Sequence, residues 1–216
     1  MFPERLTRGY RNFLEGRFAA ERTRYEQLAA TGQKPSILVI SCVDSRVSPE
    51  VIFDAAPGEL LVVRNVANLV PRYEAPVTPE EDISHQHGTS SALEFAVKAL
   101  QVRHIVILGH ALCGGIKAFA ENMPPLTSSD FIGRWMRQIA PAAEDVCVLP
   151  GERDAYLREM EHASIALGLK NLMTFPFVRA AVEAGELTLH GAHFGVATGE
   201  MLVRDPETGR FVPVGV

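Results

Sequence analysis

The chain has 216 residues, of which 47% are hydrophobic, 22% charged and 7% aromatic, and these values lie near the averages for soluble globular domains. They exclude a disordered, collagen-like or coiled-coil chain, and the length suits one large domain or two small ones. The formal net charge of −5 at pH 7 provides no basic excess for binding nucleic acid or an anionic membrane. No apolar run approaches the ~20 residues that span a bilayer, and no secretory signal is recognised among the charged first residues. We therefore expect a cytoplasmic protein with neither a nucleic-acid nor a membrane partner.

The first predicted element is a helix over residues 6–30, because its apolar residues recur at helical spacing and Gly32 follows them. Three short apolar runs rich in branched residues come later, at 36–41, 60–63 and 104–109. Such runs predict strands that are covered on both faces, as in a parallel sheet.

A helix over residues 91–100 is predicted between the second and third of these strands, since its apolar residues form one stripe. Ser91 and Glu94 have the spacing of a capping box, which places the start of this helix at Ser91. Strand, helix and strand then form a parallel crossover unit. The polar, proline-containing residues 72–87 predict an exposed loop before the helix.

The last part of the chain predicts more helices and a final pair of strands. The helices are expected at 115–122, 131–144, 154–169 and 174–184. Apolar residues interspersed with glycines over 187–203 predict a strand pair that closes one edge of the sheet. The predicted fold class is therefore α/β: one domain over residues 1–216, with a mostly parallel central sheet flanked by helices and an N-terminal helical arm at 1–32.

Two of the predicted strands run into residues that can bind a metal. Cys42 follows the first strand, and His110 and Cys113 follow the third. Ligands of open parallel sheets gather beyond the carboxyl ends of the strands, so we expect these side chains to meet although 68 positions separate Cys42 from His110. Two thiols and an imidazole suit a catalytic zinc ion, whose fourth position is left open for water. An odd count of three cysteines in a chain without a predicted export signal also favours ligands over disulfides.

Asp44 and Arg46 lie close to Cys42 in a Cys-x-Asp-x-Arg motif. In extended chain Asp44 points to the same side as Cys42, where an anionic carboxylate can accept a hydrogen bond from a metal-bound water and orient it. Arg46 can hold that carboxylate in a bidentate ion pair, which keeps it ionised and away from the open metal position. A structural ion pair at a loop is the alternative interpretation of these two residues.

Together these residues resemble the β-class carbonic anhydrases. The similarity rests on the segments 37–47, 57–59, 63–68 and 109–115, and it is close from Gln33 to Phe119. The resemblance implies zinc-dependent, reversible hydration of CO2 to bicarbonate and a proton, by attack of a zinc-bound hydroxide. By position it also implies one zinc ion per subunit and a catalytic dyad, with the ligands Cys42, His110 and Cys113 and the dyad Asp44 and Arg46.

The resemblance further implies a substrate pocket and a partner chain. Leu61, Val66 and Phe95 fall at positions that line an apolar CO2 pocket, although one branch of the family has an aromatic ring at the position of Leu61. Gln33 falls where that branch places a substrate-binding glutamine across a dimer interface. Val39 replaces a tryptophan with which another branch holds inhibitory bicarbonate, so we expect an open metal site near neutral pH. An N-terminal helix in this family tends to embrace a partner, so the minimal unit is expected to be a homodimer, with a tetramer left open.

Two alternatives stay open. Relatives on the same scaffold hydrolyse carbon disulfide or related heterocumulenes, and the sequence does not show the pocket access that separates these substrates. The second alternative is a non-catalytic protein with a structural or regulatory zinc ion, which requires a fourth protein ligand. Outside the motifs, Cys147 is expected to be a small buried hydrophobe. His190 and His193 are candidates for proton transfer only because imidazole titrates near neutral pH, and a structural role is the expected one.

Overall fold

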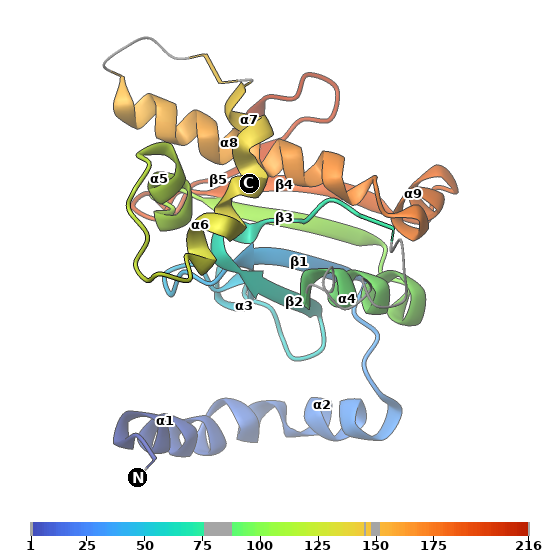
Figure 1. Cartoon of the computed structure of the whole chain (residues 1–216). Coiled ribbons are helices and arrows are strands. Elements are labelled where there is room, and N and C mark those ends of the chain that lie inside the picture. Colours follow the sequence, from blue (N-terminus) through green and yellow to red (C-terminus); the bar gives the residue numbers. More distant parts are fainter. Residues whose placement is uncertain (1, 76–87, 145, 148–151, 216) are drawn as a thin grey trace.

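The computed structural model describes residues 2–75, 88–144, 146–147 and 152–215, and its centre is one six-stranded sheet (Figure 1). The strands are β1 Ile37–Cys42, β2 Leu60–Asn65, β3 His104–His110, β4 Thr188–Phe194, β5 Met201–Arg204 and β6 Phe211–Pro213. They lie in the order β2-β1-β3-β4-β5-β6. The strands β2, β1, β3 and β4 run parallel, and β5 and β6 extend the sheet antiparallel beyond β4.

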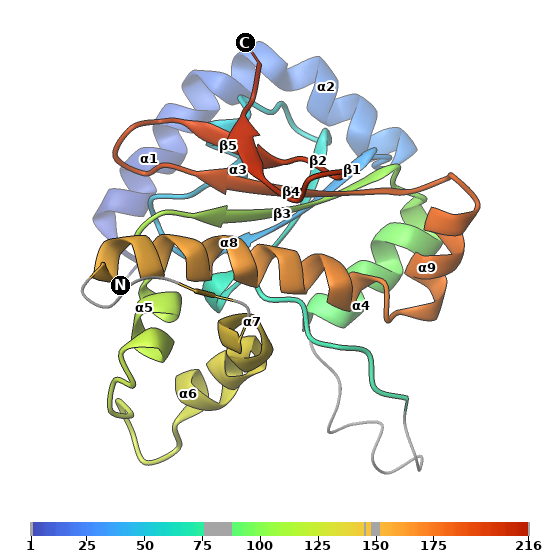
Figure 2. The same cartoon turned by 90° about the horizontal axis from the view of Figure 1, so that it is seen from above.

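Helices cover the two sides of this sheet unequally. The α-helices are α1 Glu4–Glu15, α2 Arg17–Thr31, α3 Pro49–Ile52, α4 Gly88–Glu94, α5 Gly114–Ala120, α6 Phe131–Met136, α7 Ala140–Glu144, α8 Arg153–Leu172 and α9 Pro176–Glu183. Short 3-10 or π segments are η1 Val66–Asn68, η3 Phe95–Leu100 and η4 Arg137–Ile139. Figure 2 shows α4, α8 and α9 on one side of the sheet and the arm formed by α1 and α2 on the other. In Figure 1 the ribbon of the arm is set apart from the strands.

The alternation of side chains along the strands divides the core into two layers. Leu38 and Ile107 are fully buried and face the helices, in the cluster that α8 completes. Val39 and Leu108 point to the opposite side, where partly buried apolar side chains surround them. The register pairs Ser41 with Leu108, so the carboxyl ends of β1 and β3 lie side by side.

The predicted α/β architecture is confirmed, although several helix boundaries differ. The helix predicted at 131–144 is divided by the 3-10 segment η4. The N-terminal helix is divided at Gly16, whose φ of −105° and ψ of −95° lie outside the helical region. The helix predicted to start at Ser91 begins at Gly88, so the capping box was a wrong prediction and Ser91 lies inside α4. The helix then continues as the π segment η3.

The edge strand, the third cysteine and the loop after β2 also bear on the sequence prediction. The edge strand β6 was not predicted, since three residues are too few to show a period. The prediction that Cys147 is buried was wrong, since this cysteine is exposed. Most of the loop predicted at 72–87 lies outside the described residues. Within the described ranges no single helix is long and apolar enough to span a bilayer, and α8 and α9 pass that test only together, across an 88° bend.

Candidate metal centre

The carboxyl ends of two neighbouring parallel strands supply the candidate metal donors. Cys42 is the last residue of β1 and His110 the last residue of β3. A short turn then leads to Cys113, which occupies the N-cap position of α5 with an extended backbone. One donor atom from each of the three residues lies within 4.8 Å of the other two, and all three side chains are buried. The structure therefore brings together the three residues that the sequence singled out.

His110 is arranged so that one ring nitrogen is free to bind a cation. Its Nδ1 lies 2.9 Å from the carbonyl oxygen of Ala111, and a carbonyl only accepts, so Nδ1 carries the proton and donates. The lone pair is then on Nε2, which is buried and has no hydrogen-bond partner among the described residues. A buried polar atom without a partner is costly, and a metal ion bound to Nε2 removes that cost.

The two sulfur atoms lie close enough to affect each other's ionisation. The hydrogen bond with Cys113 lowers the pKa of Cys42 to about 4 against the opposing effect of burial, and the same contact raises the pKa of Cys113. One shared proton thus prevents two buried negative charges from facing each other. A divalent cation compensates both thiolates at once, so this donor set fits zinc.

Asp44 and Arg46 form the ion pair that the motif predicts. Arg46 donates from Nε and Nη2 to the two carboxylate oxygens of Asp44 at 2.9 and 2.7 Å, and its backbone N–H donates to Asp44 Oδ1 at 2.9 Å. These bonds from Arg46 hold the pKa of the Asp44 carboxyl well below its usual range. Arg46 Nη2 also donates to the carbonyl of Leu112 at 3.2 Å. The pair therefore connects the loop after β1 with the turn after β3.

Arg64 holds the same loop from the side of β2, a role that the sequence analysis missed. Its guanidinium donates to the carbonyl oxygens of Cys42, Asp44 and Val47 at 2.8, 2.7 and 3.0 Å. Three acceptors in six residues fix the loop that carries Cys42 and Asp44. In the sequence, Arg64 directly follows the apolar run Leu60–Val63. A charged residue at the end of an apolar strand was the signal that could have pointed to this role.

The predicted substrate residues occupy different places in the single chain. Val66 packs on the cluster that contains Cys42 and Cys113. Leu61 packs against the separate cluster beneath the helices, and Phe95 is 45% exposed where η3 begins. Gln33 is exposed before the amino end of β1, whereas Cys42 ends that six-residue strand, about 20 Å further along at the usual rise. Val66 therefore lies beside the candidate metal centre, and the substrate roles of all four residues stay predictions.

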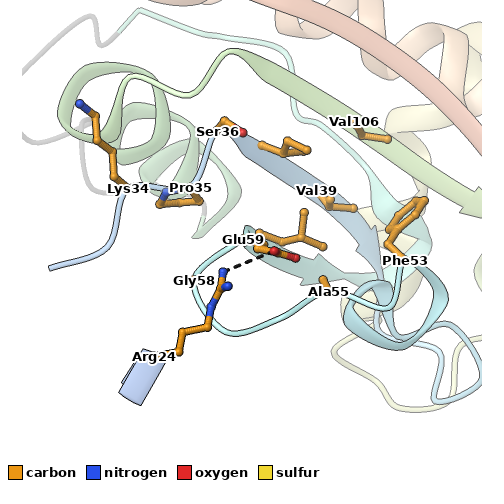
Figure 3. Close-up of a pocket in the computed structure, with 12 residues that line it drawn as sticks. Arg24, Lys34, Pro35, Ser36, Val39, Phe53, Ala55, Gly58, Glu59 and Val106 are labelled. Carbon is orange, nitrogen blue, oxygen red and sulfur yellow. Dashed lines mark ion pairs between the residues drawn. The ribbon is translucent and has the colours of Figure 1, made fainter. Parts of the chain in front are cut away.

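A groove of about 580 Å³ opens at the other end of the strands (Figure 3). It lies between α2, the segment before β1 and the amino ends of β1 and β2, and an ion pair of 3.4 Å between Arg24 and Glu59 crosses its mouth. None of the three metal-donor residues lines it. The groove and the candidate metal centre are separate features of the sheet.

The fold and the three-donor group together define an α/β protein with three side chains that could hold a metal ion, and comparisons with known proteins extend this description. The model of the family described as carbonic anhydrase matches residues 37–201. Beta carbonic anhydrase 3 of Arabidopsis thaliana is 36% identical over 203 residues, which cover 91% of this chain and 74% of that protein. The chain belongs to the β-class carbonic anhydrases.

Solved structures show the same fold. The β-carbonic anhydrase CcaA has a TM-score of 0.87 at 30% identity, with 99% of this chain and 92% of that chain covered. One of two tetrameric β-carbonic anhydrases from the filamentous ascomycete Sordaria macrospora has a TM-score of 0.72 at 26% identity, with 98% and 96% covered. The similarity therefore extends from the N-terminal arm to the last strands.

Proposed function

We propose that Cys42, His110 and Cys113 hold one zinc ion and that the chain catalyses the reversible hydration of CO2 to bicarbonate and a proton. The observation that carries this proposal is the buried group of two sulfurs and one imidazole nitrogen, all within 4.8 Å of one another. Within the described residues the group has three donors, and three protein ligands leave a zinc position for water. Membership of the carbonic anhydrase family supports the reaction.

The residues around the three donors have distinct tasks in the proposed mechanism. Zinc, when bound there, supplies the Lewis acidity that makes a nucleophile from water near neutral pH. Asp44 would accept a hydrogen bond from the attacking water and orient its lone pair toward CO2. Arg46 keeps Asp44 ionised, since its bonds lower the pKa of that carboxyl. Because Arg46 occupies both carboxylate oxygens, Asp44 is also kept from taking the position meant for water.

The substrate pocket is proposed to be apolar and to need a second copy of the chain. CO2 is uncharged, so apolar surface such as Val66 next to the sulfurs suits it better than a charged group. Leu61 and Phe95 are proposed to extend this surface. Gln33 lies before the amino end of β1, whereas Cys42 is the last residue of that strand, so Gln33 is proposed to reach the metal centre of another subunit.

The N-terminal arm supports a homodimer as the minimal unit. No residue of α1 is buried, and the apolar side chains of Leu6, Tyr10 and Leu14 form an exposed stripe along it. Arg17 and Arg24 of α2 donate to the carbonyls of Ala55 and Pro57 at 2.9 and 2.5 Å, so α2 is fixed to the loop before β2 while α1 is left to cover another chain. Assembly into a tetramer is consistent with the Sordaria relatives.

Zinc content and CO2 hydration test the proposal together. The purified chain is expected to bind one zinc ion and to hydrate CO2 in a stopped-flow assay with a pH indicator. Cys42→Ser is expected to lose both, whereas Cys147→Ser, which changes the exposed third cysteine, should keep both. Asp44→Asn should keep zinc and lose about 100-fold or more in turnover. Asp154→Asn, at an exposed carboxylate, is its matched control.

Several results would count against the proposal. A wild-type chain without zinc overturns the metal centre, and unchanged turnover in Asp44→Asn removes Asp44 from the mechanism. A zinc-loaded chain that hydrolyses carbon disulfide but hydrates no CO2 above background overturns the substrate.

A further inference from the structure

Behind the metal group, a buried acid–imidazole pair contacts the segment that carries Cys113. Glu161 of α8 and His193 of β4 are 6% and 4% exposed. Glu161 Oε2 lies 2.9 Å from His193 Nε2, and Glu161 Oε1 accepts a hydrogen bond from the backbone N–H of Cys113 at 3.2 Å. The carboxylate therefore bridges an imidazole and the residue proposed to bind zinc.

The bond from Cys113 fixes one particular peptide group. The N–H of Cys113 and the C=O of Leu112 belong to the same peptide, and that carbonyl accepts the hydrogen bond from Arg46 at 3.2 Å. Glu161 thus holds this peptide from the interior while Arg46 holds it from the side of the active site. A rotation of the peptide breaks both bonds and moves the Cys113 side chain.

Leu112 shows why the peptide needs to be held. Its φ of 61° lies in the left-handed region, an unfavourable conformation for a residue other than glycine. Its side chain is exposed, so packing of that side chain does not stabilise the turn. The hydrogen bonds at the following peptide are then what keeps the turn in this shape.

The pair itself points to a role beyond packing. A buried carboxylate is costly unless it is paired and hydrogen-bonded, and apolar residues of similar volume can replace a buried ion pair at little cost in stability. Glu161 lies in register with Ile165, Gly168 and Leu172 on the buried stripe of α8, where an apolar residue is the expected occupant. An ionised carboxylate only accepts, so His193 donates from Nε2 and orients Glu161 toward Cys113.

We propose that Glu161 and His193 are positioning residues of the metal centre. Glu161 fixes the Leu112–Cys113 peptide so that Cys113 Sγ meets the other two donors, and His193 fixes Glu161. The inference rests on the zinc site of the proposed function. Neither side chain takes part in the reaction itself; both act through Cys113. Groups that orient metal ligands in this way typically change metal affinity about 10- to 100-fold when they are removed.

Zinc affinity, measured by competition with a chromophoric chelator, tests the proposal. Glu161→Leu is expected to bind zinc about 10- to 100-fold more weakly than the wild type. Glu161→Gln should bind nearly as well, because its amide oxygen can still accept from the Cys113 N–H. Alone, His193→Leu should weaken zinc binding. Added to Glu161→Leu, it should cause little further loss of affinity, since His193 acts through Glu161. Ser164→Ala is the control, because Ser164 lies buried on the same helix and its hydroxyl has no partner among the described residues.

Two further measurements separate positioning from a purely structural role. In the cobalt-substituted protein, Glu161→Leu should shift the thiolate charge-transfer and d–d bands that report the geometry of the ligands. The gain in melting temperature on adding zinc to the metal-free protein should also shrink in this variant. An unchanged gain, with both melting temperatures lowered in parallel, overturns the proposal.

The outcomes distinguish this inference from the proposed function. A wild-type chain that binds no zinc overturns both. A wild-type chain that binds zinc, beside a folded Glu161→Leu variant of equal affinity, overturns the inference alone. If Glu161→Leu does not fold, His193→Leu decides, and equal affinity in that variant overturns it.

Discussion

Arg46 connects two loops of the candidate active site, because one guanidinium binds both the Asp44 carboxylate and the Leu112 carbonyl. We expect Arg46→Ala to lower CO2 hydration by about 10-fold or more and to shift activity to higher pH. The freed carboxylate competes with hydroxide for the metal, and it competes best at low pH, where hydroxide is scarce. A pH–rate profile between pH 6 and 9 measures the shift. Arg46→Lys keeps the charge but lacks the planar fork, so its activity and pH profile should lie between those of the wild type and Arg46→Ala. An unchanged pH–rate profile in Arg46→Ala would contradict the pairing.

Burial of His162 is expected to make the stability of the fold sensitive to acid. Burial, with the charges of His193 and Arg158, lowers the pKa of His162 to about 4, while an unfolded histidine titrates near 6.5. Between these values the unfolded chain takes up the proton more readily, so stability is lost as pH falls from about 6.5 toward 4.

The variant His162→Phe tests this prediction, because it removes the titrating group and keeps a ring against Phe211. In the wild type the ring centroids of His162 and Phe211 are 4.1 Å apart. Urea unfolding at pH 7.5 and pH 5 should show a smaller acid loss of stability in the variant than in the wild type. Other titrating groups are common to both proteins and cancel in this comparison. Equal losses would exclude His162 as a source of the sensitivity.

At the scale of elements, α8 lies close to the sheet because a glycine on each side faces a branched side chain on the other. A Cβ atom at Gly191 of β4 would lie 2.8 Å from Ile165 Cγ2, and one at Gly168 of α8 would lie 2.8 Å from Ile107 Cδ1. We expect Gly191→Ala to lower the free energy of unfolding by about 1–3 kcal/mol, as measured by urea denaturation. A Cβ atom at Gly88 meets no described residue within 4 Å, so Gly88→Ala is the control. Equal stabilities of the two variants would contradict this packing.

The elements that the sequence predicted are those whose pattern is local. β1 and β3 are continuous apolar runs, and burial on both faces leaves that pattern in the sequence. The edge strand β2 begins with the apolar run Leu60–Val63, although its residues are only partly buried. The strand β6 has three residues and includes Pro213, so neither length nor period marks it. The predicted capping box failed because Ser91 and Glu94 have the required spacing inside α4 as well as at a helix start.

At the scale of the whole molecule, the arm tests the proposed assembly. Leu6→Asp combined with Tyr10→Asp places charge on the exposed stripe of α1 and is expected to convert the dimer or tetramer into smaller species. Sedimentation velocity at micromolar concentration measures the change. Asn12→Asp is the control, since Asn12 is exposed on the opposite face of the same helix. A wild-type monomer, or an unchanged assembly in the double variant, would contradict the role of the arm.

The candidate site was predictable from the sequence where its residues lie at or just after the end of a predicted strand. Cys42, His110 and Cys113 could be joined from sequence because parallel strands end at one edge, and Asp44 and Arg46 lie within four positions of Cys42. Arg64 and Glu161 could not be assigned, since their partners are backbone groups in loops whose shape only the folded chain defines. Gln33 stays undecided for a related reason: one subunit does not contain its proposed target.

The distance along the chain between the metal donors also bears on how the protein matures. β1 supplies a single sulfur, and the other two donors are made at least 68 residues later, so no early fragment contains a complete site. If the three residues bind zinc as proposed, the complete site exists only once the strands β1 and β3 have paired. Newly synthesised chains are then expected to pass through a metal-free state, and the amount of that precursor should rise when the supply of zinc in the cell falls.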